Sequence, residues 1–212
     1  MMVSNPWPDN EKWTIIYGAS FNPVHLGHLN LMKELAEQDW VKKLVLMPVG
    51  QHAFQKKLIS GEDRLKMLAL ATKNIPKVVV SDWEIMKKTV SYTYETLLAY
   101  QIAHPEEKIA FILGSENLRD LEKWYRYEDL VTDFRTLIIE RPQSEEQKLT
   151  EKYLEHYPLM RKWTLVADQD KQVSYGLVSS TKIRERVRKG ESLVGWTTKE
   201  VANYIGRKKL YR

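Results

Sequence analysis

Two histidines stand three residues apart in the segment GASFNPVHLGHLNL, residues 18–31, where an apolar pattern of helical spacing begins. The start of a helix presents unpaired backbone N–H groups and the positive end of the helix dipole, so it attracts anions such as phosphate. Gly18 lets a ligand approach the backbone, and His25 and His28 can direct both imidazoles at the same ligand oxygens. The segment therefore predicts a phosphate-binding turn.

These histidines also have other interpretations. A lone histidine near a helix start is usually structural, but a pair that follows the first buried strand stands where an open α/β sheet binds its ligand. A zinc site is the second functional interpretation. The chain has no cysteine, and the same turn offers no carboxylate, so the set of metal ligands is incomplete. We therefore predict no metal site built by the protein itself.

A second segment, VSSTKIRERVRKG at residues 178–190, supplies hydroxyl and guanidinium groups. Ser179, Ser180 and Thr181 are candidates for the N-cap of a basic helix, and Arg184 follows one turn later. Such caps are common and usually structural, so the segment alone is a weak signal. Its interpretation as an anion-binding helix start depends on whether the fold brings it to the two histidines.

The elements that must position these residues alternate along the first two thirds of the chain. Mostly apolar strands are predicted at residues 13–18, 42–50, 77–85, 107–114 and 135–142. Helices are predicted at residues 26–38, 60–74 and 91–104, with short helical runs at 118–124 and 126–131. This alternation predicts an α/β fold with a doubly wound, mainly parallel sheet. Ligands bind such sheets beyond the carboxyl ends of the strands, which here are the segments after Gly18 and Gly114.

The last third of the chain is organised differently. It predicts a polar helix at residues 144–157, a short strand at 162–168 and helices at 179–190 and 197–206. No internal repeat divides the chain, so we predict one domain over residues 1–212, with a core at 13–141 and a small C-terminal helical portion at 142–212. We expect the basic segment IGRKKLYR, residues 205–212, to be a solvated end.

Composition excludes several classes of protein. With 212 residues and 43% hydrophobic content, the chain predicts a soluble globular protein with a substantial core. Its 33 lysines and arginines against 28 aspartates and glutamates give a net charge of +5, which is spread out rather than gathered into a nucleic-acid-binding face. There is no cysteine for thiolate catalysis and no run of 18 apolar residues. The first 13 residues show no basic segment followed by an apolar run, so we expect neither secretion nor membrane spanning. We expect a cytoplasmic protein that binds neither nucleic acid nor membrane. Its oligomeric state stays open, with a homo-oligomer as one alternative.

The two chemical segments together resemble a known family. GASFNPVHLGH resembles the first signature of nucleotidyltransferases with HxGH motifs, and SSTKIR resembles their second signature. The blocks VSDWEI, SYTYETL, FILGSENL, KWYRYEDL and VSSTKIRERV stand in the order and approximate spacing of bacterial nicotinate mononucleotide adenylyltransferases. The resemblance covers the chain from Trp13 to Ile205, and two separated signatures in register are a specific signal. It implies a Rossmann-like nucleotidyltransferase fold.

This resemblance also implies an activity and a set of roles. The activity is transfer of AMP from ATP, accompanied by Mg²⁺, to nicotinate mononucleotide, which yields deamido-NAD and pyrophosphate. The implied catalytic residues are His25, His28 and Arg184. The implied ATP-binding residues are Gly18, Ala19, Ser20, Phe21, His25, His28, Glu116, Ser179, Ser180, Thr181 and Arg184. The implied contacts of nicotinate mononucleotide are Tyr92, Thr93 and Trp124.

The sequence departs from the family pattern at a few positions. Asn22 stands where many bacterial members carry aspartate, and Ser115 and Glu116 replace Ala-Asp, so a ribose-binding carboxylate would be one methylene longer. The loop GQHAFQKKLIS lacks the family's Pro-Pro-His-Lys pattern, although Lys56 and Lys57 remain candidate phosphate contacts. These departures bear on substrate preference more than on reaction type.

Two alternatives stay open at this point. The first is a related transferase that acts on nicotinamide mononucleotide or on both mononucleotides, because local donors around the pyridine substituent decide between acid and amide. A phosphopantetheine transferase ranks lower, since it would be shorter and would lack the blocks SYTYETL and KWYRYEDL. The second alternative is a catalytically idle nucleotide-binding relative, because a fold alone does not fix function. Retained ATP binding without turnover would identify it.

Overall fold

A parallel sheet forms the centre of the computed structural model, which describes residues 6–7, 11–52, 58–87, 89–140, 154–155, 157, 160–164 and 178–212. Its six strands lie in the order β4-β2-β1-β6-β7-β8, and every neighbouring pair is parallel. The strands are β1 Trp13–Ala19, β2 Val41–Pro48, β4 Val78–Val80, β6 Ile109–Gly114, β7 Arg135–Glu140 and β8 Met160–Thr164. Two short strands, β3 Gln51–His52 and β5 Val90–Ser91, pair with each other.

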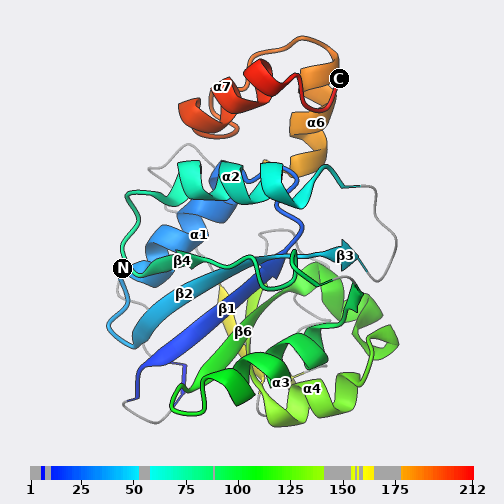
Figure 1. Ribbon diagram of the computed structural model, residues 1–212. Helices are drawn as coiled ribbons and strands as arrows, with labels where there is room; N and C mark the ends of the chain where they lie inside the picture. Colours follow the sequence, from blue (N-terminus) through cyan, green and yellow to red (C-terminus); the bar gives the residue numbers. More distant parts are fainter. Residues whose placement is uncertain are drawn as a thin grey trace.

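Helices cover both faces of this sheet, with α1 and α2 on one side and α3 and α4 on the other (Figure 1). The α-helices are α1 Leu26–Ala36, α2 Gly61–Thr72, α3 Thr93–Ala103, α4 Tyr127–Asp133, α6 Ser180–Arg188 and α7 Lys199–Lys208, and a 3₁₀ helix, η1, spans Ser115–Lys123. None of the described helices is both long enough and apolar enough to span a bilayer.

Two groups of buried side chains fill the layers on either side of the sheet. Successive strand residues point to opposite faces, so Ile15 packs with Leu35 of α1 while its neighbour Ile16 packs with Leu97 of α3. Both isoleucines are at most 3% exposed. A strand covered on both faces has no solvent side, which explains why these strands are continuous apolar runs rather than alternating patterns.

The order of the strands confirms the predicted doubly wound sheet. The chain runs outward from β1 through β2 to β4, returns to place β6 beside β1, and then runs outward the other way through β7 to β8. The strand order therefore reverses between β1 and β6. Connections that leave neighbouring strands in opposite directions open a crevice at their carboxyl ends. Here the crevice follows Gly18 and Gly114, as the sequence predicts.

Some predicted boundaries are wrong. The strand expected at 77–85 ends at Val80, because residues 82–87 form turns in which the Met86 and Lys87 backbone N–H groups donate to upstream carbonyls. The helix expected from residue 91 begins at Thr93, because Ser91 pairs with β3 instead. The strand expected at 162–168 corresponds to β8, which ends at Thr164. The other four residues of this prediction, 165–168, lie outside the described residues. Most of the polar helix expected at 144–157 also lies outside them.

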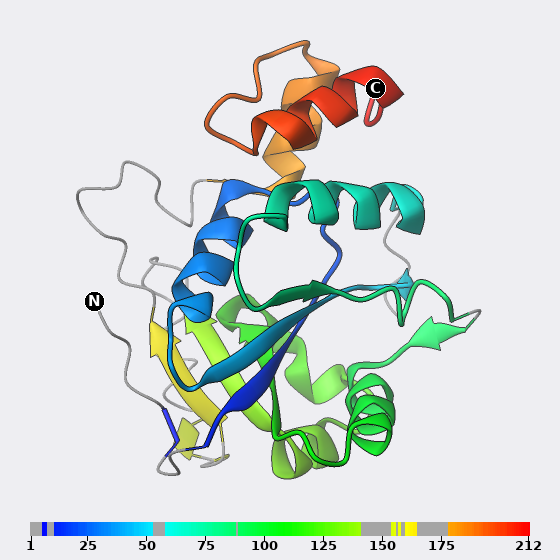
Figure 2. The ribbon, with the colours of Figure 1, turned by 60° about the vertical axis from the view of Figure 1, so that its left-hand side comes forward.

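Helices α6 and α7 lie together beyond α2 in both views (Figures 1 and 2). The Tyr204 hydroxyl of α7 donates to the Asp63 carboxylate of α2 at 2.8 Å. The expectation of a solvated end is wrong for Leu210 and Tyr211, which pack against the core, and the Tyr211 hydroxyl donates to the side-chain oxygen of Asn22 at 3.0 Å. The hydrogen bond to Asn22, which is distant in the sequence, holds this segment in spite of its basic composition.

The prediction of a single domain over residues 1–212 stays a prediction.

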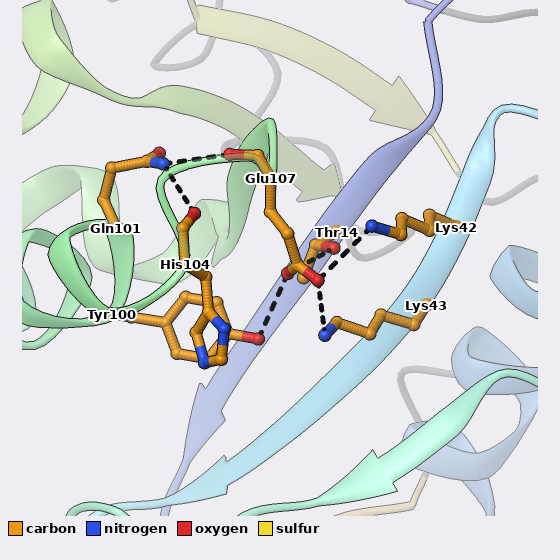
Figure 3. Close-up of polar contacts among 7 residues, drawn as sticks. All are labelled: Thr14, Lys42, Lys43, Tyr100, Gln101, His104 and Glu107. Atoms are coloured by element: carbon orange, nitrogen blue, oxygen red, sulfur yellow. Dashed lines mark hydrogen bonds and ion pairs between the residues drawn. The ribbon is translucent and has the colours of Figure 1, made fainter.

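Near the amino ends of the central strands, the buried carboxylate of Glu107 ties three elements together (Figure 3). It accepts hydrogen bonds from the hydroxyls of Thr14 in β1, at 2.9 Å, and Tyr100 in α3, at 3.3 Å. It also pairs with Lys43 of β2 at 2.7 Å and with Lys42 at 3.4 Å. Burial alone would raise the pKa of Glu107, but the hydrogen bonds from Lys43 and Thr14 and both lysine charges lower it to about 2.

Replacing this carboxylate by an amide should make stability less dependent on pH. Glu107→Gln should lower the free energy of unfolding by about 2 kcal/mol at neutral pH, because the neutral amide cannot form the ion pairs with Lys42 and Lys43. A carboxylate whose pKa falls from 4.5 to about 2 on folding stabilises the protein above pH 4.5, and this contribution is lost as the pH falls toward 2. The difference in free energy of unfolding between wild type and variant should therefore narrow on acidification.

Urea unfolding at neutral pH and near pH 3.5 measures this difference. Glu106→Gln is the matched control, since Glu106 is an exposed neighbour whose replacement should leave stability unchanged at both pH values. A wild-type to Glu107→Gln difference that stays constant with pH would show that the ion pairs contribute nothing to folding.

Candidate active site

A cavity of about 900 Å³ opens at the carboxyl ends of β1 and β6, where the strand order reverses. This volume lies in the range of cofactor and small-molecule sites. The lining contains the catalytic and substrate-binding residues that the family resemblance implies, namely Gly18, Ala19, Ser20, Phe21, His25, His28, Tyr92, Thr93, Glu116, Trp124, Ser179, Ser180, Thr181 and Arg184. The fold thus brings to one cavity residues that lie up to 166 positions apart in the sequence, as Gly18 and Arg184 do. Their roles stay predictions.

His25 and His28 hold each other in place at the start of α1. His25 is the N-cap: its Nδ1 accepts the backbone N–H of His28, and the Nδ1 of His28 accepts the backbone N–H of His25, both at 3.3 Å. The two rings stack with centroids 3.6 Å apart. A ring nitrogen that accepts an N–H is unprotonated, so each neutral imidazole carries its proton on Nε2. Both rings are therefore preset as Nε2–H donors, the form that a phosphate oxygen requires.

The segment before these histidines combines an open position with a tightly packed one. A Cβ added to Gly18 would meet nothing within 4 Å, so protein packing leaves space for a ligand beside this backbone. Phe21 is 1% exposed, and its ring packs against those of Tyr17 and His28, with centroids 5.3 and 5.0 Å away. Phe21 therefore acts on the site through the ring of His28, which it keeps in place.

Helix α6 meets the turn before α1 through two hydrogen bonds. Ser179 is the N-cap of α6, as the sequence predicts. The Ser180 hydroxyl donates to the Pro23 carbonyl at 2.8 Å, and Nη1 of Arg184 donates to the Asn22 carbonyl at 2.8 Å. The two signatures are thus joined directly, and the starts of both helices lie at the same cavity.

The guanidinium of Arg184 is held in one orientation. Besides its bond to Asn22, its Nη2 donates to the Thr181 hydroxyl at 3.0 Å. A guanidinium fixed at two atoms loses little conformational freedom when its other N–H groups bind an anion. Two helix starts, two imidazole donors and this cation together make one wall of the cavity favourable for negative charge.

Aromatic rings lie at another part of the cavity lining. The Tyr92 ring packs against that of Tyr125, with centroids 4.8 Å apart, and both side chains are partly exposed. Trp124 follows η1 and packs partly against the core. Thr93 begins α3 directly after Tyr92. Sequence reasoning missed Tyr125, although its place beside Trp124 in KWYRY was a usable signal. Such rings suit a flat ligand.

Glu84 is a second lining residue that sequence reasoning missed. Its carboxylate accepts the Thr96 hydroxyl at 2.7 Å and the Gly50 backbone N–H at 3.4 Å, and the residue is 8% exposed. Burial raises the pKa of Glu84, while the hydrogen bonds from Thr96 and Gly50 oppose this shift. Gly50 is required here, because a Cβ would overlap the Glu84 carbonyl. Glu84 thus ties the loop after β2 to α3. Lys56 and Lys57 lie outside the described residues.

Potential metal ligands gather away from this cavity. Within the described part of the chain, the one group of three is His104, Glu106 and Glu107, whose ligand atoms lie within 4.8 Å of one another. Glu107 contacts Thr14 and Lys43 near the amino ends of β1 and β2, whereas the cavity lies at the carboxyl ends, and it is already paired with lysines (Figure 3). The described carboxylates of the cavity lining are Glu84 and Glu116. Phosphate oxygens and water would therefore supply most ligands of an ion that binds with a nucleotide.

Comparison with known proteins places the chain in a family. The family model described as cytidylyltransferase-like matches residues 16–186, a range that includes both signatures. A protein of Enterococcus faecalis named "Probable nicotinate-nucleotide adenylyltransferase" is 34% identical over 199 residues, which cover 93% of this chain and 84% of that protein. The chain belongs to the cytidylyltransferase-like family, among the nicotinate-nucleotide adenylyltransferases.

Other adenylyltransferases match over almost their whole length. A protein of the same name from Caldicellulosiruptor saccharolyticus is 31% identical over 198 residues, which cover 93% of this chain and 97% of that protein. The structure of Plasmodium falciparum nicotinic acid mononucleotide adenylyltransferase complexed with NaAD superposes with a TM-score of 0.80, covering 95% of this chain and 98% of that one at 22% identity. That likeness confirms the Rossmann-like nucleotidyltransferase fold. Nucleotidyltransferases of this kind generally use a divalent metal ion.

Proposed function

We propose that this adenylyltransferase transfers AMP from ATP to nicotinate mononucleotide and releases deamido-NAD and pyrophosphate. The observation that carries the proposal is the meeting of two helix starts over one cavity, α1 with its paired histidines and α6 with Arg184. The names of the relatives from Enterococcus faecalis and Caldicellulosiruptor saccharolyticus support nicotinate mononucleotide as the acceptor.

The reaction requires no covalent bond to the protein. An oxygen of the mononucleotide 5′-phosphate attacks the α-phosphorus of ATP, the bond from this phosphorus to the bridging oxygen breaks, and pyrophosphate leaves with the electron pair. The attacking phosphate is already an anion, so no general base is needed. The protein must supply in-line placement of the two phosphates and donors for the charge that develops at the α-phosphorus.

The anion-binding wall can meet these needs. His25 and His28 would donate their Nε2–H groups to the ATP phosphates, and Arg184 would neutralise charge on the departing pyrophosphate. The Ser180 hydroxyl already donates to the Pro23 carbonyl, so we assign Ser180 to joining the two signatures. The backbone from Gly18 to Phe21, with Ser179 and Thr181, would line the nucleotide, and Glu116 would bind a ribose hydroxyl.

We propose Mg²⁺ as the metal ion. When bound to the ATP phosphates, it would screen their charge and that of the leaving pyrophosphate. It prefers to keep phosphate and water ligands rather than to enter an all-protein cage, and the described cavity lining agrees with this preference.

The aromatic part of the lining would bind the nicotinate half, with Tyr92, Thr93 and Trp124 around the ring. Trp124→Ala should raise the KM for nicotinate mononucleotide about tenfold, because the pyridine loses a stacking partner. The KM for ATP should stay within about twofold. Trp124→Phe, which keeps a smaller ring, should give an intermediate value. Steady-state kinetics with each substrate varied in turn measures both constants, and equal increases would exclude a stacking role.

The function itself is tested by measuring pyrophosphate release from ATP with nicotinate mononucleotide and nicotinamide mononucleotide offered separately. Preference for the acid is the expected result. Comparable rates would identify a dual-specificity enzyme, and preference for the amide would overturn the assigned acceptor. Binding of ATP without turnover of either mononucleotide would identify a catalytically idle relative.

A further inference from the structure

The chain turns back on itself after α7 and returns toward the active site. Lys209 and Tyr211 both adopt left-handed backbone conformations, with φ of 54° and 64°. This conformation destabilises the folded state by about 1 kcal/mol for each residue that is not glycine, so the turn persists only where packing or hydrogen bonds offset this cost. The offset comes from Leu210 and Tyr211, whose side chains pack against the core on the α2 side of the sheet.

The contact that Tyr211 makes reaches the ATP-binding segment. Its hydroxyl donates to the side-chain oxygen of Asn22 at 3.0 Å, and Asn22 is 4% exposed. The backbone oxygen of the same asparagine accepts Nη1 of Arg184. Asn22 is therefore held through both of its oxygens, by Tyr211 on the side chain and by Arg184 on the backbone. It lies in the cavity lining three residues before His25, whereas Tyr211 is not part of the described lining.

Two arginines flank this arrangement. Arg64, 2% exposed, donates from Nη1 to the Ser20 carbonyl at 3.0 Å and so braces the same segment from α2. The charges of Arg184 and Arg64 both act on the Tyr211 phenol and lower its pKa, but burial, the larger effect, raises this pKa well above its ordinary value. The phenol therefore stays protonated at neutral pH, and its hydroxyl is a permanent donor to Asn22.

We propose that Tyr211 is a positioning residue for ATP, which fixes Asn22 and thereby the relative placement of the histidine turn and the Arg184 guanidinium. This proposal rests on the adenylyl transfer proposed above. It assigns a role in nucleotide binding to a residue that lies 189 positions from its partner and outside both signatures. The role is indirect, since Tyr211 acts through Asn22 and Arg184 and does not touch the substrate.

Tyr211→Phe removes the hydroxyl and keeps the packed ring. It should raise the KM for ATP about fivefold, the equivalent of one neutral hydrogen bond, because the turn and Arg184 lose a common support. The KM for nicotinate mononucleotide should stay within about twofold, since Tyr211 packs against the core on the α2 side of the sheet, whereas Trp124 packs against the core on the α3 side. A merely structural role would lower the melting temperature without separating the two constants.

Tyr204→Phe is the matched control. It also removes a phenol hydroxyl, from α7 to Asp63 of α2, but it leaves the Asn22 contact untouched. The melting temperature should fall in both variants, whereas the KM for ATP should rise only in Tyr211→Phe. Measurement well below both melting temperatures keeps unfolding out of the kinetic constants.

A binding measurement separates this proposal from the proposed function. Calorimetric titration with a non-hydrolysable α,β-methylene analogue of ATP needs no turnover, and its affinity should fall about fivefold in Tyr211→Phe and stay unchanged in Tyr204→Phe. Unchanged affinity in Tyr211→Phe, equal rises of both KM values, or the same loss in both variants would overturn the positioning role. Wild-type protein that binds the analogue but does not turn over a mononucleotide would overturn the proposed function alone.

Discussion

Replacing His28 by alanine is expected to lower kcat by about 10²–10³-fold, the range measured when one preorganised donor to a developing negative charge is removed. The structure gives the reason for an effect of this size. Because Nδ1 of His28 is committed to the backbone N–H of His25, its Nε2–H has a fixed identity and direction before ATP binds. Steady-state kinetics at saturating ATP and mononucleotide would measure kcat. Thermal melting would show that the variant remains folded.

The same experiment on His25 needs a different substitution. His25 is the N-cap of α1, so alanine would remove a cap worth about 1 kcal/mol together with the imidazole. Asparagine is a preferred N-cap residue and lacks the Nε2–H group. His25→Asn should therefore keep most of the stability and still lose turnover by about 10²-fold. His104→Asn, at the end of α3 and outside the described cavity lining, is the control, and full activity in either site variant would remove the catalytic assignment.

The fold was accessible from sequence because its signals are local. Ile15 and Ile16 belong to an apolar run that fits only a sheet covered on both faces. Because such strands alternate with helices along the chain, they are expected to pair in parallel. The chemical segments were also readable, since an N-cap such as Ser179 depends on its immediate neighbours. Their convergence on one cavity was not encoded locally. It followed from the strand-order reversal and from the family resemblance.

The residues that sequence reasoning missed depend on distant partners. The segment IGRKKLYR is basic enough to predict a solvated end, and the core packing of Tyr211 and its hydrogen bond to Asn22 are visible only in the folded structure. Glu107 was expected only as the first residue of the strand at 107–114, and nothing near it in the sequence shows that Thr14 and Lys43 pair with its buried carboxylate. Glu84 falls where a strand was expected, so its role in joining Gly50 to Thr96 had no local signature. Each case requires the tertiary structure.

Arg184→Lys is expected to lower kcat/KM for ATP by about 10²-fold, although the charge is conserved. The guanidinium uses Nη1 for the Asn22 carbonyl and Nη2 for the Thr181 hydroxyl, and it can still offer further N–H groups to a phosphate. A lysine has all three donors on one nitrogen, so it cannot span these partners and the ligand at once. Arg188→Lys, an exposed position one turn further along α6, is the matched control and should leave kcat/KM unchanged.

The link between Arg184 and Tyr211 makes the effect of the double variant informative. Both residues hold Asn22, one through its backbone oxygen and one through its side chain, and groups that share a partner do not contribute independently. Once Arg184→Lys has released the backbone of Asn22, removal of the Tyr211 hydroxyl should cost less ATP affinity than it does in the wild type. Titration of the wild type, Arg184→Lys, Tyr211→Phe and the double variant with the ATP analogue completes this double-mutant cycle. Strictly additive losses would mean that the two residues act on ATP by separate routes and that Asn22 is not their common support.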